Sequence, residues 1–149
     1  MKYPKFIDLE EPINDLDLDE AQAAMGVTLP SDLRQHYLKY NGGRPAKNCF
    51  PFKSGLYEVR WFFPVKYGKR PTQTLEGVYS LVNDVVPEGL IPFTDDSGGN
   101  LYCYSTAEAT KHSICYWDHE QYNTPSHGVT VIAPSLQAFL QGLVKDPDL

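Results

Sequence analysis

Residues 91–105, IPFTDDSGGNLYCYS, place several oxygen-bearing side chains between two apolar runs. Asp95, Asp96 and Asn100 could bind a hard cation, because calcium sites are built from such oxygens. An EF-hand loop needs glycine at its sixth position and glutamate at its twelfth. Counting from Asp95 places Asn100 at the sixth position, and counting from Asp96 fails as well. Gly98-Gly99 instead predicts a tight turn, because glycine accepts positive φ.

One histidine has charged neighbours, in the stretch WDHE at residues 117–120. Asp118 or Glu120 could orient His119 as a general base, or the three side chains could bind a metal. Adjacent strand residues point to opposite faces, so Asp118 and His119 converge only where the chain bends. A strand that ends at Trp117 and becomes polar at its rim agrees better with that geometry.

The cysteines do not form a metal-binding pattern. They are Cys49, Cys103 and Cys115. No C-x-x-C pair is present, and no second ligand pair accompanies Cys115 and His119, so we expect buried reduced thiols without a metal. If the strands pair with Ser105 opposite Ser113, Cys103 faces Cys115. An oxidised pair is then geometrically conceivable.

The familiar enzyme signatures are absent from the sequence. It has no G-x-S-x-G elbow, no H-E-x-x-H and no G-x-x-x-x-G-K-[ST] loop. We therefore expect no catalytic residue and no cofactor. Lys66, Lys69 and Arg70 form a basic patch of the kind that nucleic-acid-binding proteins carry. The net charge of −6 and the pI near 5.1 disfavour nucleic acid and anionic membranes, and favour a basic protein partner.

Length and composition indicate one globular domain. The chain has 149 residues, of which 42% are hydrophobic, enough for a single core. We expect one domain over residues 1–149, with its core at about residues 13–144. The start, MKYPKFIDLEEP, lacks the apolar centre of a signal peptide, and no apolar run reaches the ~18 residues of a membrane span. The expected compartment is the cytoplasm.

The hydrophobic pattern predicts helices at both ends of the chain and strands between them. The expected helices are residues 13–25, a second from Pro30 or Ser31 to 41–43, a third at 74–82, and a last one after Ser135. The expected strands are 91–94, 100–105, 113–118 and 128–133. Residues 46–52 resemble a loop, and residues 56–67 one bent strand or two short strands, because Pro64 interrupts them.

This order predicts an α+β fold: a mostly antiparallel sheet with helices packed on one face, in a single domain. A βαβ nucleotide-binding fold would need its glycine-rich turn between a strand and a helix. Gly98-Gly99 lies between two strands instead.

Strand alternation places three tyrosines on one sheet face, namely Tyr102, Tyr104 and Tyr116. Leu101, Cys103, Cys115 and Trp117 share the other face. An open aromatic face would suit protein binding, because aromatic anchors with a polar rim dominate many interfaces. Its acidic rim would be Asp95, Asp96, Asp118 and Glu120. In the alternative arrangement, loops or residues 56–67 cover that face.

Four stretches together resemble a known family: LPSDLRQHYLKYNGG, GLIPFTDDSGGNLYCYS, ICYWDHE and VIAPSLQAFLQGL. Their order and spacing are similar to the SUKH superfamily in its Smi/Knr-like branch, over roughly residues 13–144. The resemblance implies an α+β fold with a mostly antiparallel sheet. It also implies a binding role, since bacterial members commonly look like immunity proteins that neutralise a cognate toxin. Fungal relatives act in cell-wall regulation through protein contacts.

The matching positions are mainly determinants of the fold. They are Leu29-Pro30, Asn41-Gly42-Gly43, Pro92-Phe93, Gly98-Gly99 and Trp117-Asp118. The sequence departs from the family at Asn100 and at Tyr104-Ser105, where some relatives carry acids, which weakens the inference of a shared polar site.

We therefore expect a non-enzymatic binding protein, an immunity protein for a basic, nuclease-like toxin domain. A regulatory scaffold is the alternative, and an unrecognised hydrolase using Asp95, Asp96 and His119 is a third. The oligomeric state stays open.

Overall fold

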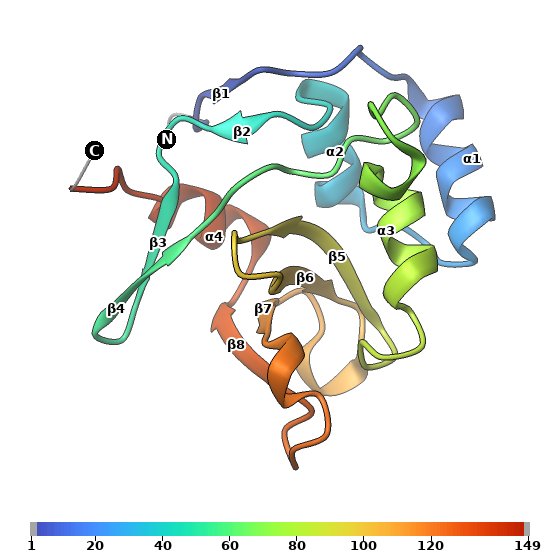
Figure 1. Ribbon diagram of the computed structural model, residues 1–149. Helices are drawn as coiled ribbons and strands as arrows, with labels where there is room; N and C mark the ends of the chain where they lie inside the picture. Colours follow the sequence, from blue (N-terminus) through green and yellow to red (C-terminus); the bar gives the residue numbers. More distant parts are fainter. Residues whose placement is uncertain (1–2, 148–149) are drawn as a thin grey trace.

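The short strand β1 comes first, two helices follow it, and a helix comes last, with the other strands between them (Figure 1). The structure is a computed structural model that describes residues 3–147, apart from the side chain of Pro71. Its helices are α1 (Asp15–Met25), α2 (Ser31–Lys39), α3 (Leu75–Val82) and α4 (Leu136–Gly142). Its strands are β1 (Phe6–Ile7), β2 (Arg44–Pro45), β3 (Cys49–Phe52), β4 (Gly55–Glu58), β5 (Leu90–Asp95), β6 (Leu101–Ser105), β7 (Ile114–Trp117) and β8 (Val129–Ala133). The predicted α+β class is confirmed.

Local sequence explains where the helices begin. Asn14 accepts a hydrogen bond from the Asp17 N–H at 2.9 Å, and the Asp17 carboxylate accepts one from the Asn14 N–H at 3.1 Å. This reciprocal pair satisfies N–H groups that the first turn of α1 leaves unpaired. Thr74 and Ser135 each accept from a backbone N–H three residues further on, at the starts of α3 and α4. Gly26 ends α1 with a φ of 69°.

The main sheet has the order β5-β6-β7-β8, and every pair is antiparallel. Tyr102 lies opposite Tyr116, and Cys103 lies opposite Cys115. The predicted register is therefore confirmed. Both cysteines are free thiols and buried, and burial raises the pKa of the Cys115 thiol to about 11.

An irregular segment, residues 59–63, covers the outer edge of β5. The backbone N–H groups of Arg60 and Phe63 donate to the carbonyls of Asp95 and Phe93, at 2.8 and 2.9 Å. On its other side, one N–H of this segment donates to the carbonyl just before β2, at 2.8 Å. The prediction of one bent strand or two short strands over residues 56–67 is confirmed in part, because the structure has the strand β4 and an isolated bridge between Phe62 and Thr94.

The expectation of a loop at residues 46–52 is wrong for its second half, because Cys49–Phe52 forms β3. Cys49 exchanges two backbone hydrogen bonds with Val144, at 3.0 and 2.7 Å. The Phe50 ring stacks on that of Phe139 in α4, with the ring centres 5.0 Å apart. These partners lie far along the chain, so the local sequence carries no sign of them.

The expectation of an open aromatic face is also wrong. Every residue of β6 is buried, so both faces of the sheet are covered there. The Phe139 ring of α4 packs against Tyr102, with the ring centres 5.6 Å apart. Tyr57 of β4 packs edge-on against Tyr116. The alternative that residues 56–67 cover this face is therefore correct in part. α4 covers Tyr102, and the Tyr104 hydroxyl donates to Asp32 of α2 at 2.8 Å.

A buried histidine lies beneath the segment 59–63. The His36 ring in α2 is almost fully buried and lies 5.2 Å from the Phe62 ring, between the ring centres. Its Nδ1 makes a hydrogen bond with the Tyr3 hydroxyl, and Nε2 has no protein partner within residues 3–147. Burial disfavours the charged imidazolium and lowers the pKa of His36 to about 3.

Candidate functional site

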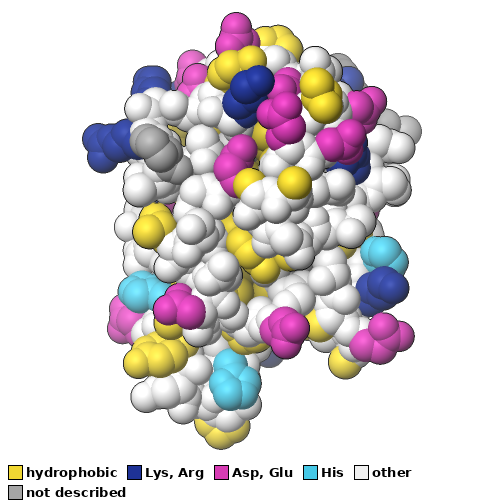
Figure 2. Space-filling view, turned by 90° about the vertical axis from the view of Figure 1, so that its right-hand side faces the viewer, with side chains coloured by type: hydrophobic (Ala, Val, Ile, Leu, Met, Phe, Trp, Pro, Cys, Tyr) yellow, Lys and Arg dark blue, Asp and Glu magenta, His cyan; other side chains and the backbone are white. Residues whose placement is uncertain are grey.

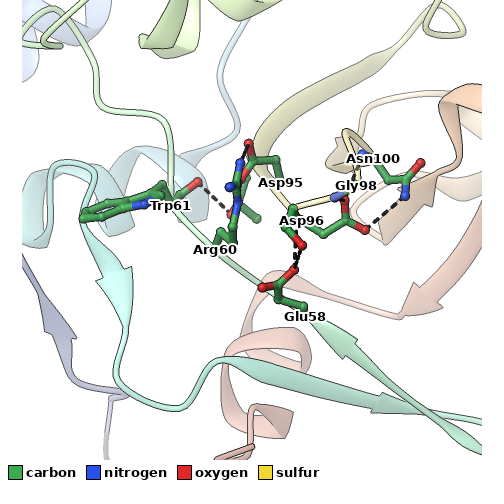
Figure 3. Close-up of polar contacts among 9 residues, drawn as sticks. Glu58, Arg60, Trp61, Asp95, Asp96, Gly98 and Asn100 are labelled. Atoms are coloured by element: carbon green, nitrogen blue, oxygen red, sulfur yellow. Dashed lines mark hydrogen bonds and ion pairs between the residues drawn. The ribbon is translucent and has the colours of Figure 1, made fainter. Parts of the chain in front are cut away.

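The Asp96 carboxylate holds the turn between β5 and β6. One of its oxygens accepts from the backbone N–H groups of Gly98 and Asn100, both at 2.9 Å. The other accepts from the Asn100 amide at 3.1 Å (Figure 3). It also accepts from the Tyr116 hydroxyl at 2.7 Å. Four donors therefore surround this carboxylate, and its capacity to accept hydrogen bonds is used within the chain.

The side chains in and beside this turn were also candidates for a cation site. Gly99 has a φ of 88°, and the backbone of the predicted glycine turn is thereby confirmed. A side chain at Gly99 would also approach the His119 ring at 3.4 Å. In the part of the chain that the structure describes, no group of three or more His, Cys, Asp or Glu residues could hold a metal ion.

Two further contacts tie this turn to β4 and to the segment after it (Figure 3). Glu58 accepts from the Ser97 N–H at 2.9 Å and from the Ser97 hydroxyl at 2.6 Å. Arg60 donates to both oxygens of the Asp95 carboxylate, at 3.3 and 2.9 Å. Both acids therefore have partners within the chain.

The two neighbouring aspartates have opposite pKa shifts. Burial raises the pKa of the Asp95 carboxyl, and the bonds from Arg60 offset that effect only in part. Burial also disfavours the charged form of Asp96. The hydrogen bonds from Tyr116, Asn100 and Gly98 together outweigh that effect and hold the pKa of Asp96 below its ordinary value.

The predicted partner-binding residues do not form one open surface. Tyr102 and Tyr104 are fully buried in the core, which corrects the expectation that they are exposed anchors. Tyr116 is half-buried and donates to Asp96. Asp118 accepts from the Glu120 N–H at 3.0 Å and begins a short 3-10 turn, His119–Gln121. Of the seven predicted residues, Glu120 alone is exposed.

The geometry does not support the hydrolase alternative. His119 Nδ1 lies 2.8 Å from the Asn100 side-chain oxygen, and the His119 N–H donates to the same oxygen at 3.2 Å. No hydrogen bond joins His119 to Asp95 or Asp96 within residues 3–147. The alternative required Asp95 and Asp96 to act together with His119, and the ring nitrogen of His119 contacts the Asn100 amide oxygen instead.

The accessible aromatic side chain of this region is Trp61. Its backbone carbonyl accepts from the Thr94 hydroxyl at 2.9 Å, and its two neighbours in the chain are bonded through their backbones. Trp61 is 46% exposed, and its ring is directed away from the Arg60–Asp95 pair (Figure 3). A fixed backbone thus presents a large aromatic side chain to solvent.

Trp61 lies between two hollows of the surface. The larger has a volume of about 720 Å³, and its lining includes Leu9, Arg60, Val78 and Leu101 as well as Trp61. The smaller has a volume of about 330 Å³, and it is lined on its polar side by Arg44, Glu58, Arg60 and Lys145. We call Trp61, Leu9, Arg44 and Arg60, with these two hollows, the Trp61 surface.

Charged groups of both signs border the Trp61 ring. The Arg44 guanidinium lies 5.5 Å from the ring centre and pairs with Asp8 at 2.9 Å. Arg60 pairs with Asp95 on the other side. An aromatic side chain inside a polar rim is the arrangement that carries much of the energy in protein interfaces.

This surface was not among the residues predicted from the sequence. Trp61 is one of only two tryptophans, and tryptophan is enriched at interfaces, so its presence was one usable signal. The stretch LYEVRWFF does not show which side of the segment faces the core, because its pairing with β5 is irregular. The structure settles this point: Val59 and Phe62 are buried while Trp61 is not.

These observations describe a small α+β domain that has an antiparallel four-stranded sheet with an exposed aromatic surface beside it. The family follows from direct comparison. The model of the SMI1 / KNR4 family (SUKH-1) matches residues 12–142. The chain belongs to this family, and the predicted family resemblance is confirmed.

Membership is consistent with an immunity role or a cell-wall-related role, and it indicates protein–protein interaction in general. A search of curated proteins found no significant match. Within residues 3–147, no helix combines the length and the apolar character that a membrane span requires.

Proposed function

We propose that this protein is an immunity protein that binds and neutralises a cognate toxin domain, and that it acts by occupying its partner rather than by catalysis. The observation that carries the proposal is the Trp61 surface: a 46% exposed tryptophan on a fixed backbone between two hollows. Such a surface loses little conformational entropy on binding, which favours affinity.

The charge of the chain favours a basic partner. A net charge of −6 attracts a cationic domain over long range and speeds association. Nuclease-like toxin domains are basic because they bind nucleic acid. The acids beside Trp61, Asp8 and Asp95, are paired with arginines, so steering arises from the whole chain rather than from one free carboxylate.

The direct test uses the product of the gene beside the one for this chain. We expect the purified toxin domain to bind with a dissociation constant in the nanomolar range or below, and co-expression to restore growth of cells that make the toxin. Binding should weaken as salt concentration rises. If no adjacent gene product binds, the immunity proposal is wrong; specific capture of endogenous cell-wall regulators would favour the scaffold instead.

A further inference from the structure

Charge is distributed unevenly along this chain. Residues 121–144 contain no Asp, Glu, Lys or Arg, although the remaining residues hold all 13 Lys and Arg and all 19 Asp and Glu. Charged side chains crowd the upper part of the face in Figure 2, at the height of α1 and α3 in Figure 1. The uncharged segment contains β8 and α4.

β8 forms an edge of the main sheet. β7 pairs with one side of it, and within residues 3–147 no strand pairs with its other side (Figure 1). The opposite edge differs, because the segment 59–63 bonds to β5 and covers it. A free edge offers unpaired N–H and C=O groups to any strand of suitable shape.

The side chains of β8 leave this edge accessible. Thr130 and Val131 are both exposed, and Val131 is 43% exposed. Successive strand residues point to opposite faces, so the middle of β8 is open to solvent on both faces. Its sequence, VTVIA, is mostly β-branched and has no charge. Within the described chain, β8 has two of the common protections of an edge strand. They are a bulge against β7 and Pro134 directly after the strand.

We propose that β8 pairs antiparallel with β8 of a second copy of this chain, so that one sheet runs through both copies. In a pairing centred on Val131, that residue meets its own copy, while Thr130 meets Ile132 and Val129 meets Ala133. All these pairs are uncharged and mostly β-branched, which favours cross-strand packing. The arrangement has two-fold symmetry, as most homodimers do.

The β8 edge is where a second copy meets the least electrostatic repulsion, and its uncharged strand is complementary to itself. Two copies that each carry −6 repel one another, and the repulsion is smallest where the facing segments have no charge. A basic partner would gain no charge attraction at residues 121–144. This proposal does not depend on the proposed function, because it concerns a different edge of the molecule from the Trp61 surface.

The dimer should be weak and should respond to salt in a characteristic way. One five-residue strand pair gives a smaller contact than the roughly 1,200–2,000 Å² of a stable interface, so we expect association in the micromolar range or weaker. Salt screens the repulsion between the two acidic copies, and dimerisation should therefore strengthen as salt rises. Binding to a basic toxin should change in the opposite direction.

Sedimentation equilibrium of the full chain tests the proposal. The average mass should rise with concentration from 16.8 kDa towards twice that value. Val131→Lys should weaken dimerisation roughly tenfold or more, because it places like charges opposite one another. Val85→Lys is the matched control, since Val85 is also 43% exposed and lies outside β8. It should dimerise as the unchanged protein does.

Hydrogen exchange provides a second measurement that needs no variant. The amides of residues 129–133 should gain protection as protein concentration rises. A monomeric mass at every concentration in high salt would overturn the proposal, as would equal dimerisation of Val131→Lys. Protection of β8 that appears only when a toxin domain is added would also overturn it, because the occupant would then be a segment of that partner.

Discussion

The turn at residues 96–100 and the segment 59–63 are neighbours, and they use their side chains in opposite ways. In the turn, polar groups bond to one another around the Asp96 carboxylate. In the segment, the backbone is bonded on both sides while Trp61 stays 46% exposed. The turn is rich in polar residues of the kind that suggest a binding site, but they are bonded to one another. The segment presents an exposed aromatic side chain instead.

The difference teaches that polar density in a sequence does not by itself indicate a binding site. A carboxylate that already accepts four hydrogen bonds must break some of them to meet a partner, and that has a cost in free energy. An aromatic ring on a fixed backbone has no such bonds to lose. We therefore expect substitutions in the turn to change stability and substitutions on the Trp61 surface to change binding.

The largest expected effect on stability is at Asp96. Asp96→Ala removes the acceptor of four hydrogen bonds and should lower the free energy of unfolding by about 2–3 kcal/mol, measured by urea denaturation. Glu120→Ala is the control at an exposed acid and should stay within about 0.5 kcal/mol. Equal losses for the two variants would show that the turn does not depend on this carboxylate.

As pH falls, we expect His36, which lies beneath the segment 59–63, to lower the stability of the fold before Asp96 in the turn does. The pKa of His36 falls from 6.5 when unfolded to about 3 in the fold. Below pH 6.5 the unfolded chain therefore binds a proton at His36 that the folded chain does not bind. The free energy of unfolding keeps its full value above that pH and should drop by about 2 kcal/mol between pH 7 and pH 5. The pKa of Asp96 is lowered, so its contribution is lost at more acidic pH.

Urea unfolding at several pH values tests this contrast. His36→Phe keeps the packing against Phe62 but cannot take up a proton, so its stability should change much less between pH 7 and pH 5. If the variant and the unchanged protein lose stability in parallel, His36 is not the group responsible.

A smaller effect is expected at the glycines of the turn. Gly99→Val should destabilise by about 1 kcal/mol or more, because Gly99 has a φ of 88° that β-branched residues rarely adopt. Gly98→Ala is the control, because Gly98 does not have a positive φ and an added Cβ would make ordinary contacts. Thermal unfolding of both variants measures the difference, and a Gly98→Ala loss as large as that of Gly99→Val would contradict the account.

The smallest effect on stability is expected at Arg60. Its pair with Asp95 is partly exposed, so Arg60→Ala should cost less than about 1 kcal/mol of unfolding free energy. Its effect should appear in toxin binding, where removing a cation beside Trp61 should speed association with a basic partner. Arg34→Ala removes a cation from an ion pair on α2 that does not line the hollows, and should change association less.

Much of the fold could be predicted because its signals are local. Asn14, Thr74, Ser135 and Gly26 mark helix ends through contacts within a few residues. Strand alternation placed Tyr102 and Tyr116 on one face and Cys103 opposite Cys115. The strand at Cys49–Phe52 could not be predicted, because its partners are Val144 and Phe139, far along the chain.

The candidate site was harder to predict for the same reason. Alternation tells which tyrosines share a face, but the sequence does not tell which elements cover that face. The rings of Phe139 and Tyr57 decide the matter through tertiary packing, and they bury the region that the pattern suggested as open. The exposure of Trp61 depends on the irregular pairing of its segment with β5.

The most direct test of the account measures dissociation of the toxin domain from Trp61→Ala by surface plasmon resonance. We expect the dissociation rate to rise about 30-fold, which corresponds to about 2 kcal/mol for an aromatic anchor. Tyr122→Ala is the matched control, because Tyr122 is a similarly exposed aromatic residue, at 51%, outside the Trp61 surface, and its dissociation rate should not change. A folded Trp61→Ala variant that dissociates as slowly as the unchanged protein would contradict the assignment of this surface.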